Sequence, residues 1–170
     1  MIDLATLRDN LHYQGLSLGA VGLVTSGLLA LAATATGPSI QAAEKRDLMA
    51  SLTQVLPGGF DNDLLADTVA VEGPGGEVTV YRARHGATID GVVFRVSGQG
   101  YAGAVVCLLG LDPQGRILGV RVLKHSETPG LGDKIEPGKS DWIERFTGKA
   151  LGNPAPEHWA VKKDGGDFDQ

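Results

Sequence analysis

The segment HSETPGLGDKI, residues 125–135, restricts the fold more than any other part of the sequence. It follows an apolar, strand-like run at residues 116–124 and precedes a helix-like run. Pro129 fixes its own φ, and Gly130 and Gly132 can adopt positive φ, so the backbone must turn sharply here. Successive N–H groups in such a turn can converge on an anion or on a carbonyl-rich ring. Taken by themselves, the same residues also fit an ordinary Pro-Gly turn between two elements.

Strand-like runs surround this turn and are joined by short turns rich in glycine, proline and aspartate. The expected strands are residues 77–85, 91–97, 101–111, 116–124 and 159–163. A helix is expected at residues 44–56, where the apolar residues share one face. Ser140 can cap a second, short helix that stops at Gly148. The sequence therefore predicts an α+β domain with a mainly antiparallel sheet flanked by helices.

Residues 11–43 contain no Asp, Glu, Lys or Arg. Residues 16–35 alone are long enough to cross the apolar core of a bilayer, which takes about 20 residues. Gly15 and Gly19 form a small-residue pair that would let another transmembrane helix approach closely. A cleaved signal peptide is the alternative, because Ala33-Thr34-Ala35 fits a cleavage pattern, but such peptides have apolar runs of only about 7–15 residues. We expect a short N-terminus at residues 1–10, a transmembrane anchor region at 11–43 and a soluble domain at 44–170.

Composition excludes several classes of protein. The chain has 170 residues and a formal net charge of −5, with no stripe of Lys and Arg among aromatic residues, so nucleic acid is not expected as a partner. Cys107 is the only cysteine, which rules out an internal disulfide and a cysteine-ligated metal centre within this chain. Because Cys107 lies in an apolar run, we expect it to be a buried structural thiol.

Three further motifs lack the chemistry that their residues suggest at first. Residues 98–103 match the dinucleotide fingerprint G-x-G-x-x-G, but a strand is expected after them instead of the helix that this fingerprint requires. His125 has no second histidine at metal-site spacing, and we expect a hydrogen-bonded histidine at the end of a strand. Asp164, Asp167 and Asp169 lack the ligand spacing of a calcium loop. The sequence therefore predicts no metal site and no catalytic residue.

Glu127-Thr128-Pro129-Gly130-Leu131-Gly132, which follows an Ile/Val/Leu strand and a histidine, resembles a signature of the FMN-binding domain family. That family includes the G subunit of the Rnf electron transport complex and the C subunit of the sodium-pumping NADH:quinone reductase. Gly100-Tyr101-Ala102-Gly103, which leads into an apolar strand, and the tail KKDGGDFDQ at residues 162–170 also fit the family pattern. The resemblance covers residues 44–170 together with the N-terminal anchor.

The resemblance implies a flavoprotein electron-carrier subunit of a membrane complex that couples electron transfer between ferredoxin and NAD to ion translocation. Its implied partners are the other membrane subunits and the iron–sulfur or flavin subunits of an Rnf-type complex. It also implies a single-pass protein of the bacterial inner membrane, with a cytoplasmic N-terminus and the soluble domain on the periplasmic side. Arg8 lies before the apolar run and Lys45 and Arg46 follow it, so charge alone does not determine this orientation.

The resemblance further implies where FMN binds. Backbone N–H groups of the turn would hold the ring or the phosphate region, and Glu127 would orient the loop by hydrogen bonding. Tyr101 would pack on the ring, and Lys163 would neutralise the phosphate. The implied cofactor-binding residues are Glu127, Thr128, Gly130, Leu131, Gly132, Tyr101 and Lys163.

In the family, the tail is followed by a Ser/Thr-Gly-Ala-Thr motif whose last threonine is joined to the FMN phosphate by a phosphoester bond. No such motif follows the tail here, so we expect the attachment threonine to lie beyond Gln170, the domain to be incomplete and these residues to carry no covalent FMN. Phe146-Thr147-Gly148-Lys149-Ala150 resembles the motif superficially but lacks the Gly-Ala-Thr order. The alternative function is a membrane-anchored binding or assembly module without redox activity.

Overall fold

The computed structural model of the chain describes residues 11–56, 58–73 and 75–168. The expected N-terminal segment 1–10, Pro57, Pro74 and residues 169–170 of the tail lie outside the described residues. The chain divides after Arg46 into two compact units. Helix α2, Leu11–Val55, runs through the expected boundary between residues 43 and 44 and contributes to both units.

The first unit contains the apolar part of α2, which is long and apolar enough to cross a membrane. The hydroxyls of Thr25, Thr34 and Thr36 donate hydrogen bonds to backbone carbonyl oxygens three or four residues earlier. These polar groups are therefore satisfied inside the helix, as a bilayer would require. Pro38 lies within α2.

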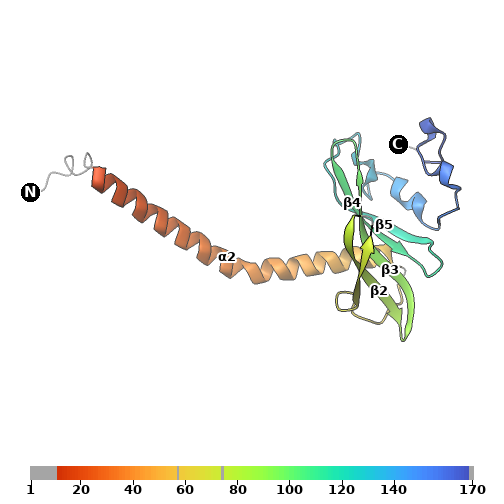
Figure 1. Cartoon of the computed structure of the whole chain (residues 1–170), viewed down its shortest axis with the longest axis horizontal. Helices are drawn as coiled ribbons and strands as arrows, with labels where there is room; N and C mark the ends of the chain where they lie inside the picture. Colours follow the sequence, from red (N-terminus) through yellow and green to blue (C-terminus); the bar gives the residue numbers. More distant parts are fainter. Residues whose placement is uncertain (1–10, 57, 74, 169–170) are drawn as a thin grey trace, which may run out of the picture. The chain divides into compact units, whose positions relative to one another are not determined.

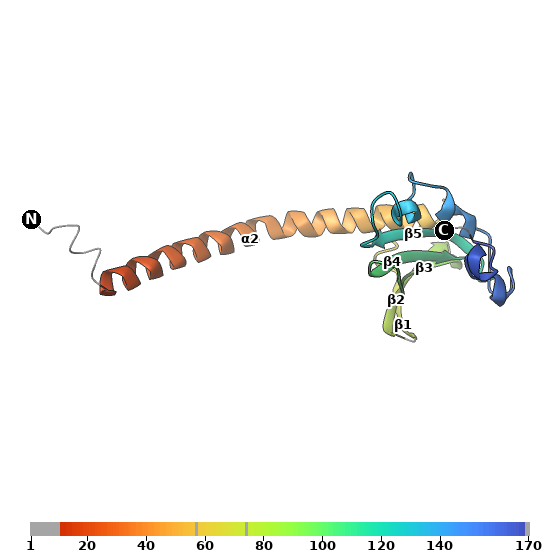
Figure 2. The same cartoon turned by 90° about the horizontal axis from the view of Figure 1, so that it is seen from above.

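The second unit contains a five-stranded antiparallel sheet in which neighbours in sequence are neighbours in space (Figure 1). The expected α+β class with a mainly antiparallel sheet is confirmed. Figure 2 shows β1 and the adjoining part of β2 bending away from the other three strands. The strands are β1 Thr68–Gly73, β2 Gly76–His85, β3 Thr88–Gln99, β4 Ala104–Leu111 and β5 Ile117–Lys124.

The last turns of α2 pack on this sheet and bury Leu52 and Val55 against residues such as Leu108. Gly110 in β4 and Gly119 in β5 are paired across the ladder, and the Val55 backbone lies directly over both. A Cβ atom on Gly119 would lie 2.9 Å from Val55 Cα, and one on Gly110 would overlap the Val55 carbonyl oxygen. The two glycines therefore allow a closer approach of helix to strand than any side chain would.

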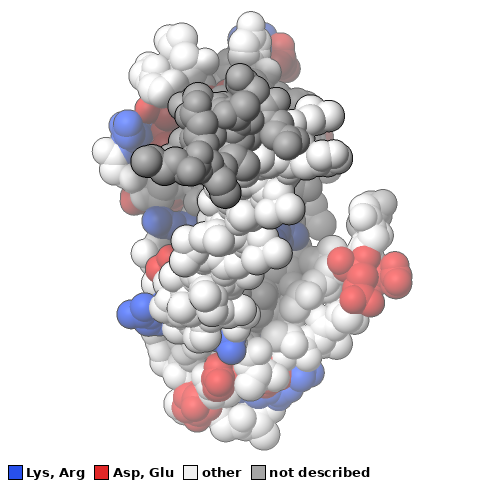
Figure 3. Space-filling model, turned by 90° about the vertical axis from the view of Figure 1, so that its left-hand side faces the viewer, with Lys and Arg blue, Asp and Glu red and all other residues white. Residues whose placement is uncertain are grey.

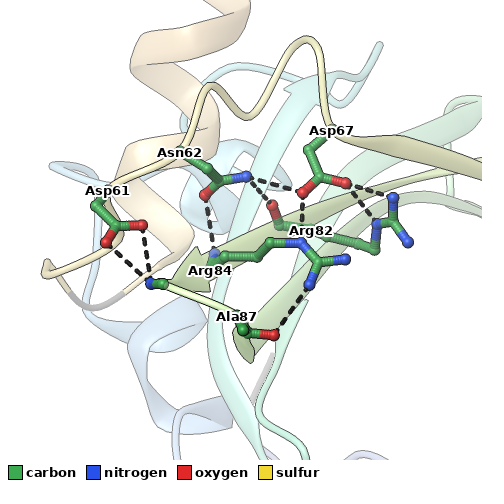
Figure 4. Close-up of polar contacts among 7 residues, drawn as sticks. Asp61, Asn62, Asp67, Arg82, Arg84 and Ala87 are labelled. Carbon is green, nitrogen blue, oxygen red and sulfur yellow. Dashed lines mark hydrogen bonds and ion pairs between the residues drawn. The ribbon is translucent and has the colours of Figure 1, made fainter.

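A polar network around Asp67 ties the segment between α2 and β1 to strand β2 (Figure 4). The Asp67 carboxylate accepts hydrogen bonds from Nε of Arg84 at 2.6 Å and from Nε of Arg82 at 2.7 Å. The pKa of Asp67 lies below its usual range, mainly because of the hydrogen bond from Arg84. Burial acts in the opposite direction and raises this pKa. Asn62 completes the network, because its side chain donates to the Arg82 carbonyl oxygen and accepts from the Arg84 N–H.

Two strand predictions need correction. Residues 159–163 do not form a strand, since η3 (Pro156–His158) and η4 (Lys162–Asp164) are short 3-10 helices and Val161 makes only an isolated bridge to Phe168. The strand expected at residues 101–111 begins at Ala104, because the Gly100 N–H donates to the Gly103 carbonyl oxygen and closes a hairpin there.

Strand β1 was not expected from the sequence. It pairs only with β2, and its Val69 and Val71 side chains stay exposed, so no buried face marks it. The short helix expected after Ser140 is the 3-10 helix η2, Trp142–Phe146. Ser140 acts near its start, because its Oγ accepts a hydrogen bond from the Trp142 N–H.

Cys107 is half-buried, where a buried structural thiol was expected. Its burial still raises the pKa of the thiol, which makes the reactive thiolate scarcer. On the face shown in Figure 3, Lys and Arg side chains are scattered and form no continuous basic area, whereas acidic side chains gather on one projection.

Candidate functional site

The turn at residues 127–132 closes on itself through its own backbone. The N–H groups of Leu131 and Gly132 both donate to the Thr128 carbonyl oxygen, at 3.1 and 3.0 Å. The N–H of Gly130, which has φ of +79°, donates to Asp133 Oδ1 at 2.8 Å. Three N–H groups that the resemblance assigned to a cofactor are thus used inside the turn. Within the described ranges, the N–H and hydroxyl of Thr128 make no hydrogen bond and remain able to bind a ligand.

Asp133 anchors this turn and was missed by reasoning from sequence. It is buried, and besides the Gly130 N–H its carboxylate accepts a hydrogen bond from Lys139 Nζ at 3.1 Å. The Lys139 hydrogen bond is the main cause that lowers the pKa of Asp133, in opposition to burial. The only signal in the sequence is a carboxylate three residues after a turn glycine, a spacing that many surface loops share.

The Glu127 side chain joins the turn to the hairpin between β3 and β4. Its Oε1 accepts a hydrogen bond from the Ala102 N–H at 3.2 Å. A Cβ atom on Gly132 would lie 2.7 Å from Glu127 Oε2, and one on Gly100 would overlap Oε1. Gly100 and Gly132 therefore provide the space in which this carboxylate lies between the two loops.

Two large side chains project into solvent from these linked loops. Tyr101 in the β3–β4 hairpin is 99% exposed, and Leu131 in the turn is 75% exposed. Soluble domains bury most such groups, and exposed apolar patches often mark a binding surface. Thr128, Leu131 and Tyr101 thus come from loops that the Glu127 carboxylate holds together. Lys163 lies on η4 and, among the described residues, makes no hydrogen bond with either loop.

His125 lies at the end of β5 and is hydrogen-bonded on both ring nitrogens, as expected. Its Nδ1 accepts the Glu127 N–H at 3.1 Å, and its Nε2 is 2.9 Å from Glu136 Oε1. The His125 and Glu136 side chains line a cavity of about 410 Å³, together with Arg121 and Lys124. No group of His, Cys, Asp or Glu able to hold a metal ion occurs in the described part of the chain, and Asp169 of the expected calcium loop lies outside it.

The C-terminal segment is held by aromatic packing. Phe146 of η2 stacks on Phe168 with ring centroids 4.6 Å apart, and Trp159 lies 5.4 Å from Phe168. The N–H of Lys162 donates to the Phe168 carbonyl oxygen at 2.7 Å. Residues 162–168 of the tail therefore form a compact turn packed against η2.

Comparison with known proteins identifies the chain. An FMN-binding domain matches residues 100–170, which include Tyr101, the turn at 127–132 and the described tail. The G subunit of the ion-translocating oxidoreductase complex of Cereibacter sphaeroides is 50% identical over 158 residues, or 92% of this chain and 72% of the relative. The chain belongs to this family of G subunits. The G subunit from Stutzerimonas stutzeri is 48% identical over 97% of this chain and 73% of its own length. That from Pseudomonas aeruginosa is 43% identical over 99% and 82%.

The family assignment made from the turn and the tail is thereby confirmed. The tripeptide Gly-Ala-Thr does occur in this sequence, at Gly86-Ala87-Thr88, a match that reasoning from sequence missed. The family motif has Ser or Thr before this tripeptide, but here that residue is His85. The tripeptide lies at the hairpin turn between β2 and β3, where His85 pairs with Thr88. β3 then runs 12 residues to the other end of the sheet. A fully extended strand of this length spans at most about 40 Å, and Thr88 and the hairpin that carries Tyr101 lie at its opposite ends.

Proposed function

We propose that the isoalloxazine ring of FMN lies against Leu131 and Tyr101, and that the chain is thereby the flavoprotein electron-carrier subunit of a membrane-bound, ion-translocating oxidoreductase complex. The position of the Glu127 carboxylate carries the proposal. It accepts the Ala102 N–H and lies between Gly100 and Gly132, so it links the two loops. The hairpin between β3 and β4 presents the flat ring of Tyr101 to the ligand, and the turn at 127–132 presents the apolar side chain of Leu131.

FMN supplies the exchange of electrons, and the protein supplies position and electrostatics. Thr128 offers a free N–H and hydroxyl beside Leu131, which suits the carbonyl-rich edge of a flavin. The exposure of Leu131 and Tyr101 leaves the ligand open to a partner, as a carrier between proteins requires. Gly130 acts through its positive φ in the turn, and Gly132 leaves space for the Glu127 carboxylate. Lys163 on η4 is the proposed neighbour of the FMN phosphate.

The first test measures the affinity of the detergent-solubilised chain for free FMN by quenching of flavin fluorescence. Leu131→Ser should weaken FMN binding by tenfold or more, because burying a leucine side chain stabilises a complex by about 1.5–3 kcal/mol. Leu151→Ser is the matched control, since Leu151 is 98% exposed in another loop. Equal affinities of the two variants would exclude Leu131 from the site. Absence of FMN binding by the parent chain would favour the module without redox activity.

We also propose that residues 11–43 remain attached as a single-pass anchor in the bacterial inner membrane, with residues 1–10 in the cytoplasm and the domain on the periplasmic side. The apolar stretch of α2 supports an anchor, and the relatives' membership of a complex supports partner subunits in the membrane. We expect the iron–sulfur or flavin subunits of an Rnf-type complex among these partners. Intact-mass analysis of membrane-extracted protein should show Met1 or its neighbour as the N-terminus. A mature protein that starts at Thr36 would instead reveal a cleaved signal peptide.

Finally, we propose that covalent FMN attachment needs a Ser/Thr-Gly-Ala-Thr motif, which residues 1–170 lack. The 170-residue chain, co-expressed with the flavin-attaching enzyme, should show no mass addition by FMN. A form extended with that motif should show one. Thr88 is the informative control residue, because it follows Gly-Ala but lies in a hairpin at the opposite end of β3 from Tyr101. Flavin found on Thr88 or Thr147 would refute the proposed requirement.

A further inference from the structure

His125 makes the hydrogen bond on which the turn at 127–132 begins. The Glu127 N–H donates to Nδ1 of His125 at 3.1 Å, so Nδ1 must carry a lone pair and no proton. In the neutral ring the proton then lies on Nε2, which can donate it to Glu136 Oε1 at 2.9 Å. The two contacts together define one tautomer and one protonation state of the ring.

We propose that His125 is the positioning residue of the candidate flavin site and a pH-sensitive latch, which holds the turn closed only while its Nδ1 is unprotonated. The effect of the latch on FMN binding rests on the proposed function. The latch itself does not.

Protonation of His125 puts a second proton on the ring, on Nδ1. Nδ1–H and the Glu127 N–H are then two donors facing each other, and their hydrogen bond is lost. The opposite contact becomes stronger, since Nε2–H of an imidazolium donates to the Glu136 carboxylate as a charged pair. The ring therefore stays with Glu136, and the backbone at Glu127 is the part that must move.

Charged groups from two segments lie around the ring. Glu136, which follows the 3-10 helix η1 (Asp133–Ile135), is its partner at Nε2. Arg121 and Lys124 of β5 line the same cavity of about 410 Å³ as His125 and Glu136. The His125 side chain is 17% exposed, so it is not sealed from solvent.

Movement at Glu127 has a direct path to the candidate site. The Glu127 side chain holds the Ala102 N–H and lies against Gly132, and its backbone leads into Thr128. Release of its N–H therefore loosens the two loops that carry Tyr101 and Leu131. We expect the flavin site to be ordered at alkaline pH and loosened when His125 is protonated.

Two substitutions separate the roles of the two ring nitrogens. In His125→Asn, the side-chain oxygen lies near the position of Nδ1 and still accepts the Glu127 N–H, but it does not titrate. In His125→Gln, the amide reaches the position of Nε2 and keeps the Glu136 contact, but leaves Glu127 without its acceptor. His85→Asn is the control, because His85 lies in the β2–β3 hairpin and binds the Gly59 carbonyl oxygen instead.

The first experiment follows the Glu127 amide by NMR hydrogen exchange in the detergent-solubilised full chain without FMN. Its protection factor should fall about fivefold from pH 8 to pH 5 in the parent chain and in His85→Asn, which is the loss of one ordinary hydrogen bond. The protection factor of the Glu127 amide should stay high at both pH values in His125→Asn. It should stay low at both pH values in His125→Gln. A protection factor that does not change with pH in the parent chain, or that changes equally in His125→Asn, would overturn the latch.

The second experiment measures FMN affinity over the same pH range. The parent chain should lose affinity by about fivefold as the latch opens, and His125→Asn should not. If the amide responds as stated and FMN affinity does not, the link from latch to site is refuted while the latch stands. If FMN does not bind at any pH, the proposed function fails, and the amide data still decide the latch.

Discussion

Gly110→Ala and Gly119→Ala should each destabilise the second unit by about 3 kcal/mol, at the upper end of the usual cost of overpacking. A new Cβ at either position would meet the backbone of Val55, not a side chain that can rotate away. The end of α2 would have to lift from the sheet and open the core around Leu52 and Leu108. Thermal unfolding should shift downward by about 10 °C or more.

Gly98→Ala is the matched control for this prediction. Gly98 also lies in a strand, but nothing lies within 4 Å of a Cβ atom built there, and its φ is not positive. Its melting temperature should therefore stay close to that of the parent chain, since substitutions away from special features change stability by about 0.5 kcal/mol or less. Equal melting temperatures for all three variants would show that α2 does not need the glycine pair.

The glycine pair illustrates what the sequence could predict. The apolar alternation in residues 77–85 and the apolar run in 116–124 predict strands, because strands that cover a core carry apolar residues in such patterns. The amphipathic face at 44–56 likewise predicts a helix on that sheet. Neither pattern says that Gly110 and Gly119 become cross-strand neighbours under Val55. That proximity depends on the register of β4 and β5, which local patterns do not determine.

The candidate site shows the same division. Pro129 and Gly130 predict a turn from backbone chemistry alone, and Gly130 does adopt positive φ. The direction of the Gly130 N–H was not predictable, because this group donates to Asp133. The Asp133 side chain is itself buried and hydrogen-bonded to Lys139. Likewise, the sequence does not reveal that Glu127 contacts Ala102 in the hairpin before β4, a contact between residues 25 positions apart.

The failed strand at residues 159–163 has a physical cause in the tail. The short apolar run that starts at Trp159 suggested pairing, but Phe168 folds back, so that its N–H donates to the Ala160 carbonyl oxygen and its own carbonyl oxygen accepts the Lys162 N–H. Stacking of Phe168 on Phe146 then replaces the pairing that a strand would make. Short apolar runs near aromatic residues are ambiguous in this way, because packing outweighs their β-propensity.

Gly165 and Gly166 explain why that fold-back is possible, and they lead to the second large effect. Gly165 adopts φ of +85° and ends η4, where a side chain would be strained. Gly166 needs space instead, because a Cβ atom there would lie 2.6 Å from Ala160 Cα and would overlap the Ala160 carbonyl group. The pair of glycines in the tail therefore answers two separate requirements of one turn.

Gly166→Ala should detach the tail from η2 while leaving the sheet folded. Because the overlap is with backbone, we expect a local cost of about 2 kcal/mol, which raises the open fraction of the segment about thirtyfold. Limited proteolysis should then cleave after Lys162 or Lys163 about thirtyfold faster, and the near-ultraviolet signal of Trp159 should weaken as Phe168 leaves it. Asp164→Ala, an exposed change in the same turn that adds no atoms, should do neither. A Gly166→Ala variant as resistant to protease as Asp164→Ala would mean that the tail tolerates a side chain there, and that its contact with Ala160 does not hold the fold-back.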